Sequence, residues 1–270
     1  MTKAPKLTPK TDVHLLYQAA VQSPDIDVPF FDRHFRKLVG RPAKVFREDF
    51  CGTAHLSCEW VRQNPERRAV GVDLHGPTLQ WGKKHNLSQL TKEQQGRVQL
   101  IKANVLDVQK PKADIVAALN FSYCIFKQRS QMLAYVANAH RSLNRDGLFI
   151  LDAWGGSETQ SIPQRDRKRL RDGCTYVWEQ VSFDPLSYHT DCRIHFEWKN
   201  GAKRRNAFTY DWRLWTVPEL KDILAEVGFK DLKILWETTN KKTGGGTGNF
   251  RYMEKGSADR GWIAYLLARP

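Results

Sequence analysis

The sequence lacks the features that would place it in a membrane, in an oxidising compartment or around a metal ion. No apolar run approaches the roughly eighteen residues of a membrane-spanning helix, and residues 1–6 lack the apolar core of a signal peptide. The cysteines are odd in number and show no metal-ligand spacing; they are Cys51, Cys58, Cys124, Cys174 and Cys192. We therefore expect a cytoplasmic protein with free thiols, no membrane partner and no metal.

Glycine is scarce where a dinucleotide-binding protein would need it. Residues 45–54 begin as an apolar strand and end in a turn with a single glycine, Gly52, instead of G-x-G-x-x-G. A helix is expected over residues 55–62, and a second strand over residues 68–73 ends in Asp73. This is the layout of a nucleotide-binding half-sheet, in which the acid binds the ribose hydroxyls. Because one glycine suits a pyrophosphate poorly, the sequence predicts a different adenosine-containing cofactor.

The turn resembles motif I of the class I S-adenosylmethionine-dependent methyltransferases, D/E-x-G-x-G-x-G. Glu48 matches the acid and Gly52 the central glycine, whereas Phe50 and Ala54 replace the flanking glycines. The resemblance implies that S-adenosyl-L-methionine binds here and leaves as S-adenosyl-L-homocysteine. The residues that it implies around the cofactor, besides Asp73, are Glu48, Phe50, Cys51, Gly52, Thr53, Leu74 and the backbone of Asn120. The turn taken alone leaves open an ordinary βα turn of any parallel sheet.

A third strand, over residues 98–108, ends in polar groups. In the methyltransferase pattern an acid or amide at the end of this strand takes the adenine amino group. The resemblance therefore implies that Asn104 contacts the adenine and that Val105 offers its backbone N–H to the ring, with Asp107 as the nearby alternative.

The remaining pattern predicts an α/β fold with a doubly wound, mostly parallel seven-stranded sheet, like the Rossmann-like methyltransferases. Residues 114–126 read as a buried strand that breaks at Asn120 and is followed by an amphipathic helix. A capping box at Thr216–Glu219 begins the last helix, which Gly228 ends. The other elements expected here are a helix over 128–143 and strands over 148–152, 231–236 and 262–268.

Residues 174–215 change to a strict alternation of apolar and polar side chains, with a hairpin signal at Asn200-Gly201. They predict a three-stranded antiparallel insertion. Enzymes similar to glycine N-methyltransferase place a lid or interface sheet here, so the insertion could cover a cleft or pair two subunits as a homodimer. The predicted organisation is a helical cap (1–40), a cofactor-binding domain (41–155 and 216–270) and the insertion (156–215).

The cap contains two amphipathic helices, over residues 12–22 and 29–38. In many small-molecule methyltransferases an N-terminal helix folds over the cofactor and presents an aromatic ring to it. Tyr17 is the candidate for that ring, and a surface position for Tyr17 is the alternative.

The predicted acceptor site lies where the fourth and fifth strands end, at the edge where open α/β sheets bind ligands. Asn120-Phe-Ser-Tyr123 occupies the slot of the N/D-P-P-Y/F motif of nucleic-acid amino-methyltransferases, without its prolines. We expect Asn120 and Tyr123 to line the site, although Tyr123 could instead pack on the next helix. Asp152 could orient an amine or act as a base. A pocket of aromatic side chains is expected from Trp154, Tyr176 and Trp215.

The positive net charge of the chain is compatible with a second function. Lys and Arg number 43 against 29 acids, a net charge of +14, which could attract a polyanion. Basic clusters occur at 165–171, 203–205 and 241–242, but solvated loops are the commoner explanation. We therefore favour transfer of a methyl group to a small-molecule nitrogen or oxygen, with an RNA or DNA base methyltransferase as the alternative. The glycine-rich segment 244–248 is interpreted as a flexible flap, with phosphate binding as a weaker alternative.

Overall fold

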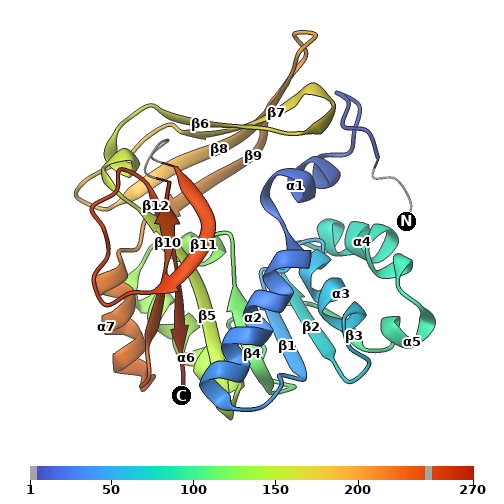
Figure 1. The fold of residues 1–270 in the computed structure, drawn as a ribbon, viewed down its shortest axis with the longest axis vertical. Coiled ribbons are helices and arrows are strands. Elements are labelled where there is room, and N and C mark those ends of the chain that lie inside the picture. Colours follow the sequence, from blue (N-terminus) through green and yellow to red (C-terminus); the bar gives the residue numbers. More distant parts are fainter. Residues whose placement is uncertain (1–4, 241–244) are drawn as a thin grey trace.

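The protein consists of two sheets, one above the other, in a computed structural model that describes residues 5–240 and 245–270. The larger sheet has eight strands and carries helices, and a four-stranded antiparallel sheet lies across its upper end (Figure 1). The helix α1 fills the space between the second sheet and α4 (Figure 1). None of the described helices is long and apolar enough to cross a membrane.

The elements follow one another as the sequence pattern predicts, with additions. The helices are α1 (Val13–Val21), α2 (Pro24–Val39), α3 (His55–Arg62), α4 (Gly76–His85), α5 (Lys92–Gln95), α6 (Arg129–Ser142) and α7 (Val217–Val227). The strands are β1 (Val45–Asp49), β2 (Arg68–Asp73), β3 (Val98–Lys102), β4 (Ala113–Ala118), β5 (Leu143–Gly155), β6 (Gln164–Arg169), β7 (Cys174–Gln180), β8 (His189–Trp198), β9 (Lys203–Arg213), β10 (Lys233–Thr239), β11 (Gly246–Tyr252) and β12 (Trp262–Ala268).

The large sheet has the order β11-β10-β12-β5-β4-β1-β2-β3, in which β1 to β5 are parallel. The chain leaves β1 in one direction to β2 and β3 and then returns to the other side for β4 and β5. This reversal opens a crevice at the carboxyl ends of β1 and β4, where doubly wound sheets bind ligands. The strands β12 and β10 close the sheet in antiparallel pairing.

Both faces of the sheet are buried, as a doubly wound fold requires. Phe149 of β5 packs in the cluster that holds α6 and α7, and its neighbour Ile150 packs in the cluster that holds α2 and α3. Trp60 and Phe31 are fully buried in that second cluster. The predicted fold class is therefore confirmed.

The strand counts need correction, because two segments expected to be irregular form strands. β11 makes the large sheet eight-stranded and begins within the segment 244–248 interpreted as a flap. Its Phe250 packs on Phe30 and Tyr265, with ring centroids 5.7 and 4.8 Å away, and its Tyr252 hydroxyl meets His34 at 2.7 Å. Gly244 of the flap lies outside the described residues.

The insertion likewise has four strands, because the basic cluster that begins at Arg165 forms the edge strand β6. Two of its charges are paired within the sheet: Arg165 Nε donates to Glu179 at 2.6 Å, and Arg167 forms an ion pair with Glu197. The predicted hairpin at Asn200-Gly201 joins β8 to β9. The inner face of this sheet is aromatic and faces the crevice.

Candidate functional site

The turn after β1 folds back on itself through three residues with positive φ. These are Phe50 (φ 57°), Gly52 (φ 51°) and Ala54 (φ 54°). Two side chains thus adopt the left-handed conformation that favours glycine, at the two positions where the motif has glycines. The Phe50 ring packs on Phe126 and Tyr135, with centroids 5.9 and 5.6 Å away. It belongs to the core and leaves the turn accessible at the half-buried Gly52.

Asp73 is fixed at the edge of this turn by backbone donors. The N–H of Gly52 donates to its Oδ2 and the N–H of His75 to its Oδ1, both at 2.7 Å. The next residue, Leu74, is 65% exposed. A rigid carboxylate beside an uncovered leucine fits a ligand that offers hydroxyls and a flat apolar ring, such as a ribose with its base.

The loop after β3 lies at the same edge. Asn104 Oδ1 accepts the N–H of Leu106 at 3.0 Å, and Val105 is 4% exposed. Asp107, the alternative, is exposed. Two buried side chains hold this loop from below. Asn138 Nδ2 donates to the carbonyls of Val105 and Val108 at 2.7 and 2.8 Å, and the Arg47 guanidinium donates to the same two carbonyls.

Glu48 lies beneath the turn and is 6% exposed. Its Oε2 accepts hydrogen bonds from the backbone N–H and the hydroxyl of Ser57. Burial raises the pKa of Glu48 to about 7. It lines a cavity of about 120 Å³ together with Asp27 and Asp152, and burial also raises the pKa of Asp27 to about 6. Three acids without a Lys, Arg or His among the described lining residues favour a cation.

The N-terminal helix α1 contacts the turn directly. Gln18 Nε2 donates to Thr53 Oγ1 at 2.9 Å, so the cap is tied to the predicted cofactor site. Tyr17 faces a second, larger cavity, which Tyr210 also lines. Cys51 is 1% exposed, and burial raises its thiol pKa, as expected for a small filler.

Gly82 of α4 is a residue that the sequence reading missed. Its Cα packs so closely on the turn that an added Cβ would lie 2.4 Å from the Thr53 carbonyl oxygen. That carbonyl also accepts Asn86 Nδ2 at 2.8 Å. The helix α4 therefore supports the turn, and only glycine permits this approach.

Replacement of Gly82 by alanine is expected to destabilise the protein by about 1–3 kcal/mol through overpacking. In an ordinary helix interior the same change stabilises by roughly 0.5–1 kcal/mol, so the sign of the effect is diagnostic. Urea unfolding measures it. Gly76→Ala in the same helix is the matched control, because its added Cβ would meet only the flexible end of Lys102. Equal effects of the two changes would contradict the close contact.

The residues that follow β4 form hydrogen bonds to the side chain of Asp152 on β5. The N–H groups of Asn120 and Phe121 donate to its two carboxylate oxygens at 2.6 and 2.9 Å. Both donors have positive φ, 54° and 57°, so the chain bends sharply to reach the carboxylate. Burial raises the pKa of Asp152 to about 7. Asn120 lines both cavities and so stands at their junction.

Two predicted lining residues belong to the core instead. Tyr123 is 1% exposed, and its hydroxyl donates to the backbone carbonyl of Asp152 at 2.7 Å. It lines neither cavity, and the structure places it as a support for Asp152. Trp215 is 2% exposed, donates to the Phe126 carbonyl at 2.9 Å and does not line the larger cavity. Trp154 and Tyr176 do line the larger cavity.

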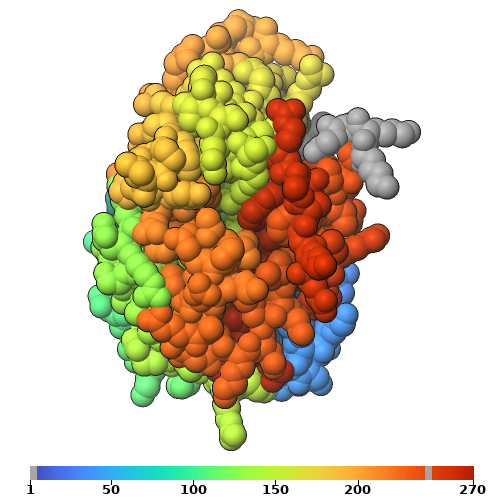
Figure 2. All heavy atoms as spheres, turned by 90° about the vertical axis from the view of Figure 1, so that its left-hand side faces the viewer, coloured from blue at the N-terminus to red at the C-terminus, as the bar shows by residue number. Residues whose placement is uncertain are grey.

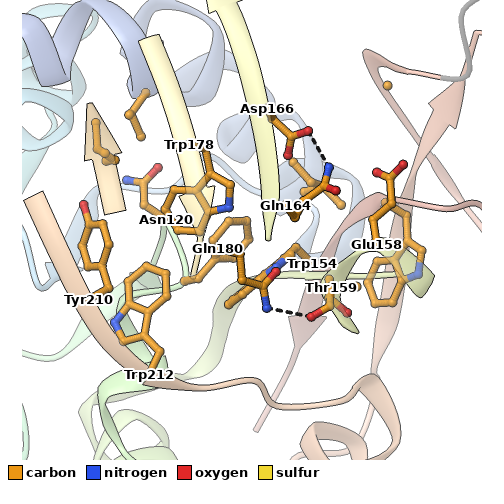
Figure 3. A pocket seen from close by; sticks show the side chains of 18 of the residues that line it. Asn120, Trp154, Glu158, Thr159, Gln164, Asp166, Trp178, Gln180, Tyr210 and Trp212 are labelled. Carbon is orange, nitrogen blue, oxygen red and sulfur yellow. Dashed lines mark hydrogen bonds between the residues drawn. The ribbon is translucent and has the colours of Figure 1, made fainter. Parts of the chain in front are cut away.

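The larger cavity, of about 360 Å³, lies between the two sheets. Figure 3 shows Trp178, Tyr210 and Trp212 of the second sheet facing Asn120 and Trp154. On the outer side of the molecule, residues around 160–170 lie beside the segment before β12 (Figure 2), where the N–H of Glu158 donates to the Arg260 carbonyl at 2.9 Å. The second sheet thus forms one wall of the larger cavity.

The fold matches solved structures over almost the whole chain. CalS10, an amino pentose methyltransferase from Micromonospora echinaspora solved with SAM bound, is 15% identical and covers 98% of this chain and 99% of its own, with a TM-score of 0.67. DesVI of Streptomyces venezuelae is 17% identical, covers 95% and 96%, and has a TM-score of 0.67. A S-adenosylmethionine-dependent methyltransferase of Clostridium acetobutylicum is 16% identical, with 94% and 96% covered and a TM-score of 0.66. No family model and no curated protein sequence matches the chain. The chain therefore has the fold of the class I S-adenosylmethionine-dependent methyltransferases.

Proposed function

We propose that the protein transfers a methyl group from S-adenosyl-L-methionine to a nitrogen or oxygen of a small molecule. One observation carries this proposal: the crevice at the turn after β1 meets a separate cavity of about 360 Å³ at Val21 and Asn120, which line both. A cofactor bound along the crevice can therefore present its reactive end to an acceptor in the cavity.

The roles of the crevice residues follow from their chemistry. Asp73 binds the ribose hydroxyls, Leu74 packs on the adenine, and Asn104 with Val105 recognises its edge. Glu48 and Asp27 attract the positively charged methionine end. The remaining contacts in this proposal come from Tyr17, Phe50, Cys51, Gly52, Thr53 and Asn120, with Phe50 acting through the shape of the turn.

The cofactor supplies, when bound, a methyl group on a positively charged sulfur that leaves as a neutral thioether. The chain's own residues position the acceptor and manage its proton. Asp152 accepts that proton, since a pKa of about 7 keeps it close to half ionised near neutrality. Asn120 orients the acceptor, and Tyr123 holds the strand end that carries Asp152.

The lining of the two cavities favours a small-molecule acceptor over a nucleic acid. No Lys, Arg or His occurs among the described residues that line either cavity, whereas phosphate binding depends on such side chains. Arg165 and Arg167 of the basic cluster pair with Glu179 and Glu197. KedS8, a sugar N-methyltransferase 17% identical with a TM-score of 0.62, covers all of this chain. Pairing of two copies through the insertion stays a prediction.

Replacement of Asp73 by alanine is expected to weaken S-adenosyl-L-homocysteine binding about 10- to 100-fold, since a hydrogen bond to a charged group contributes roughly 1.5–3 kcal/mol. Calorimetric titration measures the affinity. Asp222→Ala is the control and should bind as the wild type does, because Asp222 is an exposed residue of α7 on the other side of the large sheet's centre from β2. The reverse ranking would move the cofactor away from Asp73.

The function itself is tested with S-adenosyl-L-methionine that carries an isotopically labelled methyl group. The protein is incubated with a metabolite extract, and products are sought by mass spectrometry. We expect a labelled small molecule and no labelled RNA or DNA. Label in the nucleic-acid fraction alone would favour the alternative function, and tight cofactor binding without any labelled product would contradict catalysis.

A further inference from the structure

We propose that the acceptor is a primary or secondary amine that arrives as a cation and stacks a ring or apolar body on the tryptophans of the larger cavity. This inference rests on the proposed function and narrows it from a nitrogen or oxygen acceptor to an amine. It comes from the charge, the rings and the hydrogen-bonding groups of that cavity.

The described ionisable side chains that line the cavity are acids and tyrosines. The acids are Glu158, Asp166 and Glu237. Glu158 has a cationic partner, Arg260, at 3.1 Å. Asp166 accepts a neutral hydrogen bond from Gln164 at 2.9 Å, and Glu237 accepts the N–H of Gly248 at 2.7 Å. Neither of these two carboxylates forms an ion pair within the described ranges. In a chain of net charge +14, such a cavity selects for positive charge.

The rings form a continuous platform next to these acids. Trp212 lies 4.2 Å from Tyr210, 5.8 Å from Trp154 and 6.0 Å from Trp178, measured between ring centroids. Asp166 stands directly opposite Trp178 in the pairing of β6 with β7, and both face the cavity (Figure 3). A cation beside tryptophan faces is attracted by their π electrons, and a flat body gains stacking contact.

The buried amide of Gln180 adds a further acceptor. Its Nε2 donates to the Thr159 carbonyl at 2.6 Å and to Thr190 Oγ1 at 2.9 Å. Both of its donor hydrogens are therefore engaged with the protein, which leaves the Oε1 lone pairs to receive a donor. The carboxylates and this amide oxygen all accept hydrogen bonds. An ammonium group suits them because its single nitrogen carries several N–H donors.

An amine also suits a proton acceptor that lies next to Asn120, a residue that lines both cavities. The ammonium form is held by the acids but carries no lone pair, so it must lose one proton before it can attack the methyl group. Asp152 lies beside Asn120, whose N–H it accepts, and its carboxylate takes that proton. An alcohol would gain little from the acids, because it arrives without charge.

Matched pairs of probes test this inference on the full-length protein saturated with S-adenosyl-L-homocysteine. Each pair exchanges an ammonium for a hydroxyl: tryptamine and tryptophol, benzylamine and benzyl alcohol, glucosamine and glucose. Indole-3-acetate and glucose 6-phosphate are the anionic probes. Ligand-observed NMR titration at constant pH and ionic strength gives the affinities. We expect at least one amine to bind about tenfold or more tightly than its alcohol, and both anions to bind more weakly than either.

Three variants separate charge from stacking. Asp166→Asn should weaken the amine about two- to fivefold, the size typical of a solvent-exposed ionic contact, and leave the alcohol unchanged. Trp178→Leu should weaken both members of a pair. Asp222→Asn on α7 makes the same change of charge away from the cavity and should alter neither.

Equal binding of amine and alcohol in every pair, tighter binding of an anion, or no binding of any probe would overturn the inference. Because the cofactor product is titrated first, a failure of S-adenosyl-L-homocysteine to bind identifies a failure of the proposed function instead.

Discussion

Asp152→Asn is expected to lower the turnover number by a factor of about 10²–10⁴, the usual contribution of a positioned general base. Asp152 is 6% exposed, and burial raises its pKa to about 7. An amide has nearly the same shape but cannot take a proton. Affinity for S-adenosyl-L-homocysteine should stay close to that of the wild type, since Asp73 and the turn after β1 are unchanged.

The pH profile makes this prediction specific to proton transfer. The carboxylate must be ionised to act, so wild-type turnover should rise as the pH increases through about 7. The variant should lose this rise together with its activity. Since Asn can accept only one of the two N–H groups that Asp152 accepts, the melting temperature must be measured in parallel. Wild-type turnover with a stable, cofactor-binding variant would remove Asp152 from the mechanism.

Arg47→Met is expected to lower the free energy of unfolding by about 3–5 kcal/mol, because it strands a buried charge. The side chains of Arg47 and Asp49 are both 0% exposed, and Nε lies 2.7 Å from Asp49 Oδ1. The same guanidinium donates to the carbonyls of Val108 and Val105 at 2.6 and 3.2 Å. It therefore links β1 to the loop that carries the predicted adenine contacts. Urea unfolding gives the stability.

A double variant, Arg47→Met with Asp49→Leu, separates the effect of the unpaired charge on stability from the effect of the lost loop contacts on cofactor binding. Replacing both members of a buried ion pair by apolar side chains is often close to neutral for stability, so most of the loss should be recovered. The loop would still lack the donors of Arg47, and S-adenosyl-L-homocysteine should still bind more weakly than it does to the wild type. Recovery of stability and affinity together would show that Arg47 serves packing alone.

The sequence predicts those parts of the fold that depend on local pattern. The run from β1 to Asp73 is short, its hydrophobic period is clear, and Asp73 lies where the nucleotide-binding layout expects it. The hairpin at Asn200-Gly201 and the capping box at Thr216 are likewise local, and both form as predicted. The Asn120 turn was found because a buried apolar strand ends there.

The incorrect predictions concern segments whose structure depends on residues distant in the sequence. β6 reads as a basic loop until Glu179 and Glu197 supply its partners. β11 needs Phe30 and Tyr265 from other elements. Nothing local to Tyr123 reveals that its hydroxyl reaches the Asp152 carbonyl.

A local pattern in the sequence indicates the buried ion pair. Arg47 and Asp49 are two residues apart in a strand and so share one face, and a cation within a buried strand requires a buried partner. No such pattern in the sequence indicates the close approach of Gly82 to the turn, because a glycine can occur within a helix for several reasons.

The central claim is that the crevice beside Asp73 binds S-adenosyl-L-methionine, and isothermal titration calorimetry tests it most directly. We expect one molecule of S-adenosyl-L-methionine or S-adenosyl-L-homocysteine to bind each chain, with Asp73→Ala weakening both and NAD or ATP giving no heat. Heat from NAD or ATP, with none from either sulfur compound, would contradict the account.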